Sequence, residues 1–119
     1  MLSITNLTLR RVPKIPFQKI KEEVLGKKYE LSLVLAGNAL MKKLNTEYRH
    51  KNKIASVLSF PLSKKEGEIF INLSQKKHSP LFLFIHALLH LKGLEHSVKM
   101  KRQEQELMKR YGQRHHHRP

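Results

Sequence analysis

The apolar segment PLFLFIHALLHL, residues 80–91, restricts the fold of this chain more than any other feature of its sequence. Ser79 can cap a helix that begins there, and Pro80 suits the first turn of that helix. Because apolar residues occupy its whole circumference, we expect this helix to be buried at the centre of the protein. Gly93 follows shortly afterwards, and glycine in that place is typical of a helix end. The segment is too short to span a lipid bilayer.

The rest of the sequence predicts a mixture of strands and helices around this central helix. Helical or alternating spacing of apolar residues, bounded by Gly and Pro, predicts each element. We expect strands at residues 3–9, 29–37, 55–62 and 68–72, and further helices at 16–26, 38–49 and 97–111. The first strand should lie at a sheet edge, and Pro61 should end the third. This order predicts an α/β (α+β) fold, with helices packed on a small mixed sheet of about four strands.

A chain of 119 residues with no internal repeat or linker is expected to form one domain, which we place at residues 1–111. Residues 112–119, GQRHHHRP, are expected to be a disordered tail. His115, His116 and His117 in this tail can bind metal weakly, as His-rich tracts do, but we do not interpret them as a functional site.

Three histidines in HALLHLKGLEH are candidate metal ligands. His86 and His90 are four residues apart, so they project from one face of the central helix. Gly93 permits a sharp turn that can bring His96 back toward them. The chain has no cysteine, so a metal would have to be held by His, Asp or Glu. Three imidazoles with an open fourth position are typical of a catalytic zinc site.

The alternative is that His86 and His90 are core histidines bonded to backbone groups. Two buried imidazoles without partners would cost roughly 1–3 kcal/mol each, and their spacing with Gly93 and His96 favours metal binding. The same spacing occurs in metzincin peptidases, which carry a glutamate general base directly after the first histidine. Here that position is Ala87, which cannot accept a proton. This substitution argues against a peptidase.

The formal net charge of +15 indicates a polyanionic partner such as RNA. The alternatives are a basic protein without a polyanion partner and, less favoured, an anionic membrane surface. The first residues lack the long apolar core of a signal peptide. Together with the absence of cysteine, this predicts a soluble cytoplasmic protein.

Four sequence blocks together resemble one family, the YbeY metal-dependent endoribonucleases. HALLHLKGLEH resembles the family motif H-G-x-L-H-L-x-G-Y-D-H. LNTEYR (44–49), VLSFPL (57–62) and GEIFIN (67–72) resemble three further family blocks in the same order. The resemblance covers about residues 29–110. It departs from the family pattern at Ala87, at Ala55-Ser56, at Leu94-Glu95, and in a shorter segment before the metal helix.

The resemblance implies a zinc-dependent, single-strand-specific endoribonuclease of ribosomal RNA maturation and ribosome quality control. It implies one Zn²⁺ per chain held by His86, His90 and His96, and RNA of the small ribosomal subunit as the partner. Arg49 matches the family's functional arginine in the RNA-binding or catalytic groove, where it could clamp a phosphate. Without the resemblance, a surface cation would be the favoured interpretation of this residue.

Glu95, beside His96, could orient an imidazole or act as a base, or it could be a solvated carboxylate. Two other functions stay open from the sequence. One is a non-catalytic RNA- or ribosome-binding protein with a structural metal. The other is a metallohydrolase of another substrate, such as a peptide.

Overall fold

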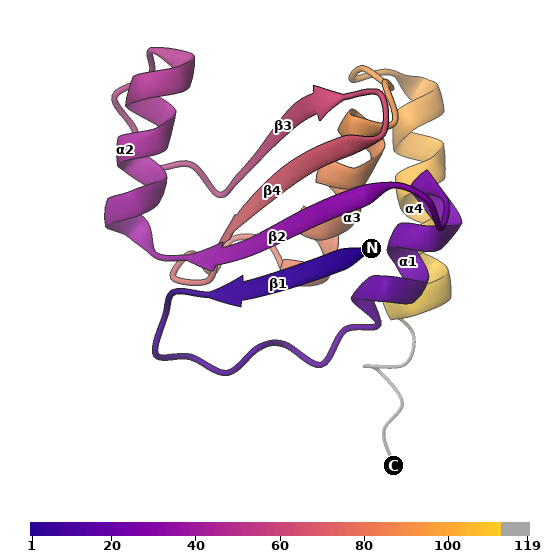
Figure 1. Cartoon of the computed structure of the whole chain (residues 1–119), viewed down its shortest axis with the longest axis horizontal. Coiled ribbons are helices and arrows are strands. Elements are labelled where there is room, and N and C mark those ends of the chain that lie inside the picture. Colours follow the sequence, from indigo (N-terminus) through magenta and orange to yellow (C-terminus); the bar gives the residue numbers. More distant parts are fainter. Residues whose placement is uncertain (113–119) are drawn as a thin grey trace.

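The computed structural model describes residues 1–112 of the chain. Four strands and four helices follow one another in the predicted order (Figure 1). They are β1 (Leu2–Asn6), α1 (Phe17–Leu25), β2 (Glu30–Ala36), α2 (Asn38–Arg49), β3 (Val57–Ser63), β4 (Glu66–Asn72), α3 (Pro80–Leu91) and α4 (Val98–Gly112). The predicted fold class is therefore confirmed. Gly112, assigned from sequence to the tail, belongs to α4, and the remaining tail residues 113–119 lie outside the described part.

The four strands form one mixed sheet in the order β1-β2-β4-β3. β1 and β4 both run parallel to β2, whereas β3 pairs antiparallel with β4. β1 and β3 are the two edges, as expected for β1. Strand β1 ends three residues earlier than predicted, because the Asn6 Oδ1 accepts hydrogen bonds from the Thr8 backbone N–H (3.0 Å) and the Thr8 hydroxyl (2.7 Å), which turns the chain.

One face of the sheet forms the main core. Alternate residues of β2 and β4, such as Leu33, Leu35 and Ile69, pack with helices α1, α3 and α4 in a single buried cluster. The other face is covered by α2 through a smaller cluster of Ala36, Met41 and Leu58. In Figure 1, α2 lies at the opposite end of the sheet from α1 and α4.

Helix α3 begins and ends as its local sequence predicts. The Ser79 side chain accepts a hydrogen bond from the Phe82 backbone N–H at 3.1 Å, and Pro80 occupies the first turn. Gly93, just beyond the helix, has a φ of 101°, which glycine adopts without strain. The helix carries seven buried residues: Leu81, Leu83, Phe84, Ile85, Ala87, Leu88 and Leu89. None of the helices within residues 1–112 is both long enough and apolar enough to cross a membrane.

Strand β3 continues through Pro61, so the prediction that this proline ends the strand was wrong. The Asn72 N–H donates to the Ser56 carbonyl, so even-numbered residues of β3 exchange hydrogen bonds with β4. The backbone of residue 61 therefore points to the free edge, where the missing N–H of proline breaks no ladder bond.

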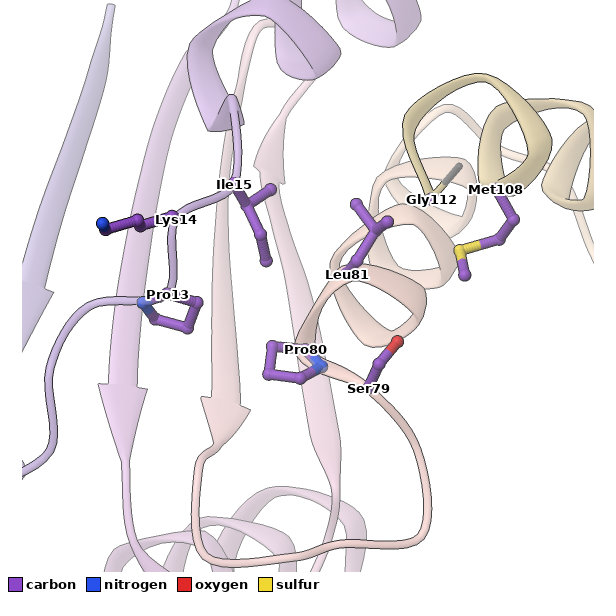
Figure 2. Close-up of a pocket in the computed structure, with 8 residues that line it drawn as sticks. All are labelled: Pro13, Lys14, Ile15, Ser79, Pro80, Leu81, Met108 and Gly112. Carbon is purple, nitrogen blue, oxygen red and sulfur yellow. The ribbon is translucent and has the colours of Figure 1, made fainter. Parts of the chain in front are cut away.

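A mostly apolar cavity of about 510 Å³ lies where the N-terminal loop meets the start of α3 and the end of α4 (Figure 2). Ile15 and Leu81 face each other across it, while the Lys14 side chain extends away. Its lining offers neither a histidine nor a carboxylate. The cavity therefore provides no histidine or carboxylate that could bind a metal ion or act as a general base.

Candidate metal centre

His86 and His90 project from the same stripe of α3 and meet side by side. Their Nε2 atoms are 3.2 Å apart and their ring centroids 4.6 Å apart. Both side chains are half-buried, because their neighbours Ala87 and Leu89 point into the core while the histidines lie at its margin. The four-residue spacing predicted this pairing.

His96 closes the cluster through the turn that follows α3. The Gly93 N–H donates to the His90 carbonyl (2.9 Å), and the Leu94 N–H donates to the Leu89 carbonyl (3.1 Å). This turn places the His96 ring 5.2 Å from the His86 ring and 4.7 Å from the His90 ring, measured between centroids. One nitrogen from each of the three residues lies within 4.8 Å of the other two. The predicted convergence of the three histidines is thus present.

The arrangement fits a single metal ion. Zn–N bonds of about 2.0–2.1 Å at tetrahedral angles separate two ligand nitrogens by about 3.4 Å. The separation of 3.2 Å between the His86 and His90 Nε2 atoms is close to this value. His86, His90 and His96 could therefore hold one ion with small adjustments, in a donor set of three imidazoles that suits zinc.

Glu104 is a member of the site that the sequence reasoning missed. Its Oε2 lies 2.6 Å from the His86 Nδ1, and its side chain is only 13% exposed. A carboxylate in this place accepts the Nδ1–H of the imidazole, which leaves the Nε2 lone pair directed at the cluster. Glu104 comes from α4, so no sequence spacing links it to His86.

The surroundings of His90 favour its neutral imidazole. Burial lowers the pKa of His90, and the neighbouring His86 and His96 lower it further. A hydrogen bond with the Leu94 backbone raises this pKa, and the charge of Arg49 has the smallest lowering effect. A neutral imidazole is the form that binds a metal ion.

Arg49 lies at the last turn of α2, at the free edge of β3. One guanidinium nitrogen donates to the Ser59 carbonyl at 3.4 Å, and the guanidinium carbon lies 6.0 Å from the centroid of the Phe60 ring. The Ser59 carbonyl points away from β4 and is therefore free to accept this bond. Arg49 is exposed, and its charge reaches His90, so it stands at the margin of the site. Its role in cleavage stays a prediction.

Glu95 is exposed beside His96. Within residues 1–112, its carboxylate makes no side-chain hydrogen bond or ion pair. The carboxylate that contacts an imidazole is instead that of Glu104. A role for Glu95 as a base or an orienting group stays a prediction.

Two more rings continue the histidine stripe toward the start of α3. Phe82 stacks on His86 with a centroid distance of 5.8 Å, and His78 stacks on Phe82 at 5.1 Å. His78 is exposed, and its stacking on Phe82 was not predicted from the sequence. The four-residue spacing of residues 82, 86 and 90 signals the helical part of this row, whereas His78 precedes the N-cap Ser79, where helical spacing does not apply.

The fold and the site together define an α/β protein with a cluster of three imidazoles that could hold a metal ion. The sequence model described as Endoribonuclease YbeY matches residues 4–117 of this chain. The chain therefore belongs to the YbeY family, and the resemblance seen in the sequence blocks is confirmed.

Curated relatives carry the same family name. The endoribonuclease YbeY of Pelagibacter ubique (strain HTCC1062) is 38% identical over 100 residues, which covers 68% of this chain and 65% of the relative. That of Ehrlichia ruminantium (strain Gardel) is 40% identical over 82 residues, covering 56% and 52%. That of Clostridium botulinum (strain Kyoto / Type A2) is 31% identical over 143 aligned positions, covering 85% and 86%. The matched part of this chain thus spans between half and two thirds of the first two relatives.

A solved structure from Thermotoga maritima, titled as the solution structure of TM1509, has a similar fold. The TM-score is 0.57 at 22% sequence identity, and the match covers 88% of this chain and 86% of that one. At this identity the similarity concerns the fold alone.

Proposed function

We propose that this protein is a zinc-dependent, single-strand-specific endoribonuclease that acts in ribosomal RNA maturation and ribosome quality control. The observation that carries the proposal is the cluster of His86, His90 and His96 in a chain of the YbeY family. The relatives are named endoribonucleases, which supports RNA as the substrate. The net charge of +15 suits a polyanion, and we place the activity in the cytoplasm, on RNA of the small ribosomal subunit.

The residues of the site would have separate roles in the proposed reaction. His86, His90 and His96 would hold one zinc ion, and Glu104 would keep the His86 ring in the tautomer that binds it. When bound, zinc supplies a Lewis acid and lowers the pKa of a coordinated water. Arg49, fixed at the edge of β3, would bind a phosphate of the RNA through its paired N–H groups and offset charge that develops there.

A peptidase of the metzincin type is disfavoured by the position of Ala87. This residue follows His86, where those enzymes carry their glutamate base, and it is 1% exposed in the core. Its methyl side chain cannot accept a proton, and it points into the core and not toward the three histidines. Metal-dependent cleavage of a peptide by the purified protein would be needed to revive this alternative.

A second candidate function is RNA binding without cleavage, with the metal serving stability alone. It is favoured by the hydrogen bond of Glu104, the one carboxylate that lines the hollow beside His86 and His96 within residues 1–112. A carboxylate committed to His86 is not free to activate a water. This candidate predicts salt-sensitive RNA binding and no hydrolysis.

The deciding experiment compares cleavage of ribosomal RNA by the protein and by His90→Ala. Both carry Ala in place of His115, His116 and His117, so that the tail adds no metal ligands. Each protein is tested loaded with zinc and after chelation. Cleavage by the zinc-loaded protein alone supports the nuclease. Equal RNA binding by both proteins with no cleavage by either moves the conclusion to a binding protein.

A further inference from the structure

A row of stacked rings leads from the surface to the candidate metal centre. Phe82 and His86 lie one turn apart on α3, and His78 lies just before the N-cap Ser79. The ring planes are inclined by only 29° between His78 and Phe82 and by 25° between Phe82 and His86. The exposed His78 forms the outer end of the row, and the inner end is a metal-ligand candidate. The row therefore joins an accessible flat ring to the place where a phosphodiester would be cut.

His78, at the outer end of the row, is held in place by contacts with Gln75 and Phe82. The Gln75 side chain donates to the His78 carbonyl (2.8 Å) and accepts from the His78 N–H (3.1 Å). These two bonds fix the backbone of the exposed residue, and Phe82 supports its ring from below. A ring fixed before binding loses little conformational entropy when a planar ligand stacks on it.

The charge around the row suits a polyanion. Lys76 and Lys77 precede His78, and both are exposed. The sequence from residue 73 to 94 contains no Asp or Glu. The hydrogen-bonded Glu104 is the carboxylate that reaches the inner end of the row from another element. Flat rings beside lysines are the combination with which proteins bind single-stranded nucleic acid, since every base has a face that can stack.

We propose that His78, supported by Phe82, is a stacking position for an unpaired RNA base that flanks the scissile phosphate. The inference rests on the proposed function for its substrate class. It adds a binding position to the three imidazoles, and it explains a preference for single strands, because a base inside a duplex exposes no face to His78. His78 is here a positioning residue, which contacts the base and leaves the reacting atoms to the metal site.

The test measures binding of two fluorescent probes in the presence of a chelator, so that cleavage plays no part. One probe is a short oligouridylate, and the other is a ribose-phosphate oligomer of equal length without bases. His78→Ala should weaken binding of the oligouridylate about five- to tenfold, the low end of the effect of removing a stacking ring, and leave the baseless oligomer unchanged. His78→Phe should restore the affinity, since it keeps a ring.

Phe82→Leu provides a second variant, because leucine keeps an apolar side chain against the core but removes the ring beneath His78. It should show the same selective loss, and circular dichroism should show that the variant remains folded. His78→Lys is the control for charge: it adds a cation but no ring, so it should raise the affinity for both probes alike without restoring the preference for the oligouridylate. An equal loss for both probes, or no loss for either, would overturn the proposal.

The result for the stacking position can be distinguished from the result for the proposed nuclease activity. A selective binding loss in a protein that cuts no RNA would leave the stacking position standing and remove the proposed activity. Cleavage and binding that are both unaffected by His78→Ala would leave the nuclease standing and remove the stacking position.

Discussion

The His86 Nδ1 and the Glu104 Oε2 lie 2.6 Å apart, joining α3 to α4 directly beside the three-imidazole cluster. Both side chains are largely shielded from water, with exposures of 21% and 13%. The contact leaves the His86 Nε2 facing His90 and so fixes which nitrogen can bind a metal. Glu104 thus belongs to the site although it lies eighteen residues from His86 in the sequence.

Glu104→Gln should weaken zinc binding by about 10- to 100-fold, the usual effect of losing a partner of a metal-bound histidine. Glutamine keeps the size of the side chain but not the negative charge that favours the Nδ1–H tautomer. Isothermal titration with zinc measures the change, and the exposed Glu106→Gln on the same helix serves as the control. Equal zinc affinity in Glu104→Gln and the unchanged protein would contradict a role for this contact.

The contrast between His96 and Glu104 shows what the sequence could predict. The three histidines were predictable because their convergence depends on local geometry: one helical turn and one glycine with positive φ. Glu104 was not, because its position depends on how α4 packs on α3, and the sequence shows only that α4 has an apolar side. The sequence also offered Glu95 by adjacency, but adjacency does not fix the direction of a side chain.

The predictions about the fold show the same contrast between local and long-range effects. Helix α3 was predicted closely because Ser79, Pro80 and Gly93 act on their immediate neighbours. The predicted end of β3 was wrong because the effect of Pro61 depends on whether its backbone faces β4 or the free edge. That alternation follows from the register between two strands, which the sequence of β3 alone does not contain.

Arg49→Ala should reduce RNA cleavage by roughly 10- to 1000-fold, as for other groups that offset charge at a reacting centre, while changing stability by less than about 0.5 kcal/mol. The small stability effect follows from the exposure of Arg49. Arg49→Lys should recover only part of the activity, because an ammonium group lacks the paired N–H donors. Single-turnover cleavage and urea unfolding check the two parts, and Lys42→Ala, at an exposed position of the same helix, is the control. Full activity in Arg49→Ala would remove Arg49 from the mechanism.

Gly67→Ala should destabilise the fold by about 1–3 kcal/mol. A Cβ built at Gly67 would clash with the Tyr29 hydroxyl oxygen and lie 3.1 Å from the two methyl carbons of Leu91, so the neighbouring side chains would have to move. Within residues 1–112 the Tyr29 hydroxyl is buried without a hydrogen-bond partner. Tyr29→Phe should therefore be neutral or slightly stabilising, and it should reduce the cost of Gly67→Ala in the double variant. If urea unfolding shows that the effects of the two single variants simply add in the double variant, the predicted contact between residue 67 and the Tyr29 hydroxyl would be contradicted.

Zinc should stabilise the folded protein, and His90→Ala should abolish that stabilisation. An ion that binds the native state at a hundred times its dissociation constant adds about 2.7 kcal/mol to the free energy of unfolding. In His90→Ala the central imidazole of the cluster is missing, so the remaining two bind the ion far more weakly. Thermal unfolding of proteins with Ala in place of His115, His116 and His117, with and without zinc, measures the difference. His50→Asn, which removes an exposed imidazole from a position with a φ of 58° that asparagine tolerates, is the matched control and should keep the full zinc response. A zinc-dependent rise in Tm that persists in His90→Ala would place the metal elsewhere.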